Sequence, residues 1–150
     1  MNTKYLFCFI ALFLLGYSCS QTNKTASNAN SSEINYGDLN LNKGKNIVQT
    51  VCITCHDPKA SVSDRIAPPL EIVKRNYLAT FEKERDFISS ITNFIMHPTE
   101  EQARLHADIE ENGLMDPLGY SEQEIQSVAM FIYRTNLERP DWLSSEDDPD

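Results

Sequence analysis

Several residue types are scarce in this sequence, and each scarcity excludes a class of protein. Only 5 Gly and 7 Pro occur among 150 residues, which excludes a collagen-like chain or one of low complexity throughout. Basic residues are also few, because 13 Lys and Arg face 22 Asp and Glu, giving a net charge of −9. Nucleic-acid binding needs clustered Lys and Arg, so this composition argues against it and favours basic protein partners. The length allows one compact domain with tails.

Strands are missing from the pattern as well, since no segment alternates apolar and polar residues convincingly. Apolar residues recur at helical spacing instead, in three stripes over residues 44–51, 87–95 and 125–132. Ser121 and Glu124 form a capping box before the last stripe, and Thr99 and Gln102 form another before a short polar helix expected to end near Gly113. The sequence therefore predicts an all-α fold.

A long apolar run occurs only at the N-terminus, from Leu6 to Leu15. It falls short of the roughly 20 residues that a membrane-spanning helix needs and is typical of a secretory signal. The following Leu-Gly-Tyr-Ser-Cys19 segment resembles a bacterial lipoprotein signal, which implies cleavage before Cys19 and acylation of its thiol. An ordinary signal peptide and a permanent membrane helix are the alternatives. The lipoprotein interpretation places the protein on the periplasmic side of a bacterial membrane, held by a lipid anchor.

Composition divides the chain into four parts. Residues 1–18 form the signal peptide, and residues 19–37 are a lipidated, Ser- and Asn-rich tether with almost nothing to bury. The folded domain is expected over residues 38–143, and residues 144–150 form an acidic, disordered tail.

The remaining cysteines carry the chemistry. Cys52-Ile-Thr-Cys55-His56 is the C-x-x-C-H signature for attachment of a c-type haem. Two thiols at this spacing on a helix exit can each bond one haem vinyl group, and the adjacent imidazole can then bind the iron. Three other interpretations are a thioredoxin-like dithiol, a zinc site and a structural disulfide.

Around this motif the sequence resembles class I c-type cytochromes. Gly44 stands eight residues before Cys52, Pro68 and Leu70 follow His56 in an Ala-Pro-Pro-Leu segment, and Val128 and Phe131 match a helix-crossing pair. The resemblance implies a small helical domain wrapped around a single covalently bound haem c. It implies further that the Pro68 carbonyl accepts a hydrogen bond from the haem-binding His56 and that Leu70 packs on the haem.

The resemblance also implies a second iron ligand, a methionine shortly before the last helix. Met115 occupies that place, after the helix-breaking Gly113 and before Pro117, although Asp116 separates it from the proline. The metal ligands expected are therefore His56 and Met115. The competing candidates are Met96, Met130, His97 and His106.

A haem iron with two protein ligands has no vacant position for substrate. We therefore expect an electron-transfer protein of a bacterial respiratory chain rather than an enzyme, with redox partners that carry a basic docking patch. The alternative is a haem-based ligand-binding sensor or peroxidase-like enzyme with an open distal position. Four residues could contact haem propionates but are better explained as surface or edge residues: Arg65, Arg75, Tyr77 and Trp142.

Overall fold

The structure, a computed structural model, describes residues 34–144. This part of the chain contains five α-helices, two short 3-10 helices and no strand, which confirms the all-α prediction here. The predicted signal peptide, Cys19, most of the tether and the tail beyond residue 144 lie outside the described residues. In chain order the elements are η1 (Tyr36–Asp38), α2 (Leu41–Thr50), η2 (Cys52–Thr54), α3 (Leu70–Leu78), α4 (Glu84–Met96), α5 (His106–Asn112) and α6 (Glu122–Arg134).

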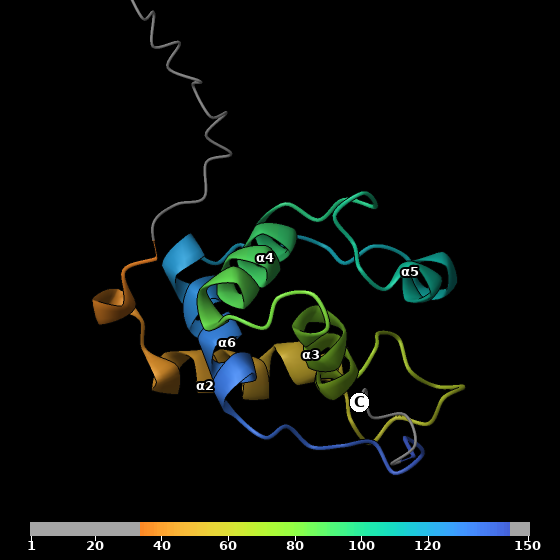
Figure 1. The fold of residues 1–150 in the computed structure, drawn as a ribbon. Coiled ribbons are helices and arrows are strands. Elements are labelled where there is room, and N and C mark those ends of the chain that lie inside the picture. Colours follow the sequence, from red (N-terminus) through yellow and green to blue (C-terminus); the bar gives the residue numbers. More distant parts are fainter. Residues whose placement is uncertain (1–33, 145–150) are drawn as a thin grey trace, which may run out of the picture. The chain divides into compact units, whose positions relative to one another are not determined.

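The core lies where α2 and α4 both pack against α6, the last helix of the chain (Figure 1). Within α4, Phe87 and Ile88 have no exposed surface, and Phe87 meets the ring of Tyr133 edge-on with ring centroids 5.2 Å apart. The apolar stripes predicted from the sequence supply this core, and their buried members are Ile47, Val48, Phe87, Ile88, Ile91, Ile125, Val128, Ala129 and Ile132.

Gly44 allows α2 and α6 to approach closely. A Cβ atom at this position would lie 2.0 Å from the main-chain oxygen of Ser127, much closer than any real carbon–oxygen contact. Only glycine fits there. The crossing that the Gly44–Val128–Phe131 pattern implied is therefore present in the structure.

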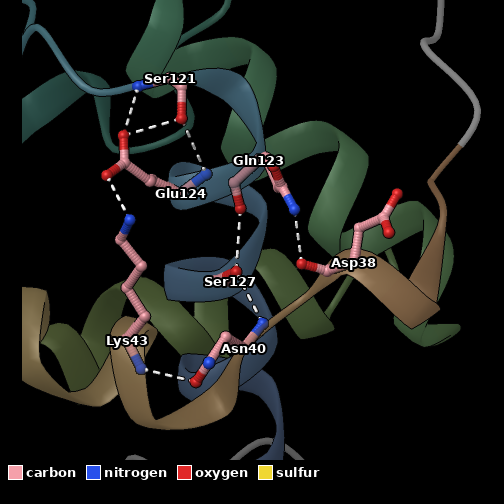
Figure 2. A pocket seen from close by; sticks show the side chains of 7 residues that line it. All are labelled: Asp38, Asn40, Lys43, Ser121, Gln123, Glu124 and Ser127. Carbon is pink, nitrogen blue, oxygen red and sulfur yellow. Dashed lines mark hydrogen bonds and ion pairs between the residues drawn. The ribbon is translucent and has the colours of Figure 1, made fainter.

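The N-termini of α2 and α6 are joined by polar contacts (Figure 2). The Glu124 side chain accepts hydrogen bonds from the backbone N–H and the hydroxyl of Ser121, which confirms the predicted capping box. Glu124 also pairs with Lys43 of α2 at 2.7 Å, and Asn40 caps α2 by accepting from the N–H of Lys43. These contacts fix how the first and last helices begin.

The predicted start of the short polar helix is wrong, although the Thr99 hydroxyl accepts from the Gln102 N–H as a cap would. Thr99 and Gln102 form an isolated turn, and α5 begins only at His106. Two neighbours of the turn explain why no helix continues from it. Ala103 is buried, and the Arg104 guanidinium lies over the Phe81 ring at 5.2 Å, so packing against the segment that follows α3 determines the backbone here.

Ordered structure also begins earlier than expected. The predicted tether extended to residue 37, but Ile34 is 5% exposed and belongs to the core, and Asn35 caps η1. Ile34 is an isolated apolar residue in a polar stretch. The free energy gained by burying its side chain offsets the entropy lost when the neighbouring residues become ordered. None of the helices between residues 34 and 144 is long and apolar enough to cross a membrane.

Candidate cofactor-binding site

The two cysteines of the motif lie at the exit of α2. The helix ends at Thr50, and the chain tightens into η2, which contains Cys52. The carbonyl of Cys52 then accepts hydrogen bonds from the N–H groups of both Cys55 and His56, at 3.2 and 2.9 Å. This turn fixes the backbone positions of the two thiols and the imidazole within five residues. The sequence prediction of a helix exit at the motif is confirmed.

Both thiols are free in the structure, with Cys52 half-buried and Cys55 exposed. Burial raises the pKa of Cys52 to about 11, so its thiol is protonated at neutral pH. Two separate thiols are what addition to two vinyl groups requires, since each S–H adds across one carbon–carbon double bond.

His56 is oriented by Pro68, as the resemblance implied. The Nδ1 atom of His56 lies 2.6 Å from the Pro68 carbonyl oxygen. A carbonyl can only accept, so Nδ1 carries the proton and Nε2 keeps its lone pair in the neutral ring. Burial lowers the pKa of His56, although the hydrogen bond to Pro68 opposes this shift. The neutral imidazole with a free Nε2 is the form that binds a metal ion.

The loop over residues 57–69 brings the Pro68 carbonyl to His56. Ser61 donates to the Asp64 carboxylate at 2.6 Å, and the backbone N–H of Lys59 donates to Asp57 at 2.9 Å. The loop ends where the fully buried Pro69 precedes α3. Leu70, predicted to pack on a haem, is buried as a member of the core cluster, and its contact with a haem stays a prediction.

Met115 lies in the irregular segment between α5 and α6. Gly113 ends α5 with φ of 84° and ψ of 173°, so the helix stops as predicted but the chain leaves it extended. Met115 is half-buried, and no described hydrogen bond joins it to His56 or to the cysteines. Its role as an iron ligand therefore stays a prediction. Among the competitors, Met130 is core, as expected, at 4% exposure.

Arg65 makes long-range contacts that the sequence did not reveal. Its guanidinium lies 3.2 Å from Asp108 and 3.6 Å from Glu111, both of α5, and stands over the Trp142 ring at 5.7 Å. The Trp142 indole N–H donates to the carbonyl of Ala60 at 3.0 Å. We call Arg65, Asp108, Glu111 and Trp142 the Arg65 junction. No local sequence pattern predicts this junction. Apart from the two acidic residues on α5, its members are 31 to 77 residues apart along the chain.

Two other residues were candidates for propionate contacts, and the interpretation of one of them, Tyr77, as a surface or edge residue is wrong. Arg75 pairs with Glu71 within α3 at 2.9 Å. Tyr77 is 3% exposed in the core, and burial raises its pKa to about 12. α3 itself, with Leu70 and Tyr77 facing the core, was not anticipated from the sequence.

Exposed apolar side chains concentrate in the segments that carry the predicted site residues. Of the six large hydrophobic residues classed as exposed between residues 34 and 144, four lie in or beside the site segments: Ile53, Val62, Ile66 and Leu114. The most exposed is Ile66 at 61%, two residues before Pro68. A porphyrin is a large apolar plate, and apolar side chains beside the attachment motif fit such a group. The free thiols, the oriented imidazole and these side chains together fit a c-type haem.

A pocket of about 370 Å³ lies at the opposite end of α2 from the motif (Figure 2). The polar groups that line it already bond one another; for instance, Ser127 donates to the carbonyl of Gln123 and accepts from the N–H of Asn40. We interpret this pocket as a structural joint between two helix N-termini. Within the described part of the chain, no group of three or more His, Cys, Asp or Glu residues could hold a metal ion as a zinc site would.

Comparison of the chain with protein-family models, curated proteins and solved structures gave no match in any of the three.

Proposed function

We propose that this protein is a monohaem c-type cytochrome that transfers electrons in a bacterial respiratory chain, anchored by a lipid on the periplasmic side of a membrane. The hydrogen bond between His56 Nδ1 and the Pro68 carbonyl carries this proposal. The bond spans twelve residues and leaves Nε2 available to bind a metal, on a residue that directly follows the second of two free cysteines. Neither a structural disulfide nor a redox-active dithiol requires an imidazole whose Nε2 is oriented to bind a metal.

In this proposal the chain holds the haem by three residues in one turn. Cys52 and Cys55 form the covalent attachment, and His56 supplies the proximal nitrogen. The haem, when bound, supplies reversible cycling between ferric and ferrous iron. The Pro68 carbonyl holds the imidazole in one tautomer and increases its basicity as a ligand.

Met115 is the distal ligand in this proposal. Its thioether would serve with His56 as the second protein ligand of the iron, and would thereby exclude exogenous ligands and raise the reduction potential relative to more basic ligand sets. Gly113 and Pro117 support the role, because they hold the intervening segment out of helix.

The charge distribution supports basic partners. Three segments form what we call the cofactor end: residues 57–69, 106–118 and 136–144. They hold eight acidic and three basic residues, a net charge of −5, whereas the rest of residues 34–144 holds nine acidic and eight basic residues. Negative charge on this end favours fast encounter with a positively charged redox protein, and salt should slow that encounter.

Production in cells that mature c-type cytochromes tests the attachment. We expect the purified protein to be red, to keep its colour after denaturation and to show a mass increase of one haem. The Cys52→Ser/Cys55→Ser variant should lose the covalent haem. A colourless wild-type protein with free or disulfide-bonded Cys52 and Cys55 would overturn the proposal.

Carbon monoxide tests the distal position. The ferrous wild-type protein should bind carbon monoxide poorly, and Met115→Ala should bind it readily. Met96→Ala is the matched control, because Met96 is the competing methionine at the end of α4, and it should behave like wild type. If the wild-type protein binds carbon monoxide readily, the distal position is open and the sensor or enzyme alternative replaces the carrier.

A further inference from the structure

α5 is held to the rest of the protein differently from the other four α-helices described. It has no buried residue, whereas each of the others buries at least two. Two of its carboxylates approach Arg65 in the loop of residues 57–69. The Arg65 and Asp108 side chains are only 17% and 14% exposed, so this ion pair is partly shielded from water. Removing one partner of such a shielded pair leaves the other charge uncompensated, which costs more than breaking a pair at the surface.

Arg65 is in turn braced by the C-terminal segment. The segment after α6 returns past α3, where Lys74 donates to the Thr135 carbonyl at 2.7 Å, and Pro140 is fully buried. Trp142 then lies under the guanidinium and is bonded to Ala60. Figure 1 shows the three segments on the same side of the domain, with α5 above the loop and the C-terminal segment below it.

We propose that Arg65 is a positioning residue for the distal ligand: it ties α5 to the loop that carries Pro68 and thereby holds the Met115 segment in place. The link is short, since Asp108 lies in the first turn of α5, the helix ends at Asn112, and Met115 follows three residues later. The inference rests on the proposed function, because it concerns a haem held by His56 and Met115.

The loop that carries Pro68 and the segment that carries Met115 would then be connected through the Arg65 guanidinium. His56 is fixed from the loop by the Pro68 carbonyl, and Arg65 is three residues before Pro68 in the same loop. Release of α5 should leave attachment and the proximal side intact and affect only the distal side. This selectivity separates a positioning role from a general effect on folding.

Arg65→Gln and Asp108→Asn test the junction from its two sides. In each variant we expect covalent haem at the wild-type level, a weaker red absorption band of the ferric methionine-ligated haem, and roughly tenfold faster binding of carbon monoxide to the ferrous protein, equivalent to about 1.4 kcal/mol. The double variant should be no worse than the more severe single one, because both changes remove the same contact. Arg65→Lys keeps the charge and should recover part of the band.

Arg134→Gln is the matched control, since Arg134 forms an ion pair with Glu84 between α6 and α4, outside the cofactor end. It should leave the band and the carbon monoxide rate unchanged. The positioning role of Arg65 would be overturned if both Arg65→Gln and Asp108→Asn bound carbon monoxide at the wild-type rate. It would also be overturned if Arg65→Gln changed that rate and Asp108→Asn did not. Either result would leave the cytochrome proposal intact. Absence of covalent haem, or of the methionine band, from the wild-type protein would instead overturn the proposed function.

Discussion

The helical core and the cofactor end are built by different means. In the core, α2, α4 and α6 bury a continuous set of apolar side chains, and α2 touches α6 closely at Gly44. Around the cofactor end, directional polar contacts join the segments in addition to a few buried residues: a carbonyl orients His56, a guanidinium holds α5, and an indole ties the C-terminal segment to the loop. Close packing fixes the frame, and a few directional contacts place the groups that would meet a haem.

The largest effect should come from preventing haem attachment. We expect the Cys52→Ser/Cys55→Ser chain to be largely unfolded at 25 °C, because a domain of this size has a thin core and the haem would supply much of its apolar contact area. Far-UV circular dichroism measures the result. If the variant keeps most of its helical signal, α2, α4 and α6 are stable by themselves and the two regions are more independent than we propose.

A smaller but still large effect is expected at the helix crossing. Gly44→Ala forces a Cβ against the Ser127 carbonyl and should lower the free energy of unfolding by about 3 kcal/mol. Denaturant unfolding of the haem-loaded protein measures it. Lys45→Ala, at the exposed neighbouring position, should change stability by less than about 0.5 kcal/mol. Equal effects of the two substitutions would show that the crossing tolerates a wider separation.

Removing one hydrogen bond from the helical core and one from the cofactor end tests directly whether the two regions are held together differently. Trp142→Phe removes the bond to Ala60, and Tyr133→Phe removes the bond from Tyr133 to the Glu82 carbonyl. Each should cost about 1 kcal/mol. Hydrogen exchange should show faster opening confined to residues 57–69 for Trp142→Phe, but a general loss of protection for Tyr133→Phe. The same pattern in both variants would mean that the regions unfold as one unit.

The smallest effect concerns acid stability. Lys43 and Ser121 lower the pKa of Glu124 to about 2, from an ordinary value of 4.5 in the unfolded chain. The folded pKa is the lower one, so this stabilisation is present above pH 4.5 and is lost as the pH falls towards 2. The difference in unfolding free energy between wild type and Glu124→Gln should shrink over that range. Lys43→Gln should reproduce part of this behaviour, and a difference that stays constant with pH would contradict the assignment.

Local patterns in the sequence predicted the core well. The spacing of apolar residues on α4 and α6, Gly44, and the Ser121–Glu124 box each appear in the structure as expected. These features depend on neighbours within one or two helical turns or on a close approach that only glycine permits. The C-x-x-C-H turn and the His56–Pro68 bond were also predictable, the second through its resemblance to a known family.

Features that depend on distant partners were missed or misjudged. Thr99 and Gln102 have the composition of a helix start, but Arg104 and Ala103 pack elsewhere and prevent the helix. Arg65 was considered for a propionate contact, and nothing near it in the sequence points to Asp108 or Trp142. Such contacts form only when the fold brings segments together.

The acceptor that holds His56 belongs to the main chain, and every amino acid carries the same carbonyl. A mutational scan that replaces side chains one at a time would therefore pass over this contact, and residue 68 could score as tolerant while its oxygen remains indispensable. Exchange of the carbonyl oxygen of residue 68 for sulfur, which weakens the acceptor without altering any side chain, would reveal a dependence that genetics alone conceals.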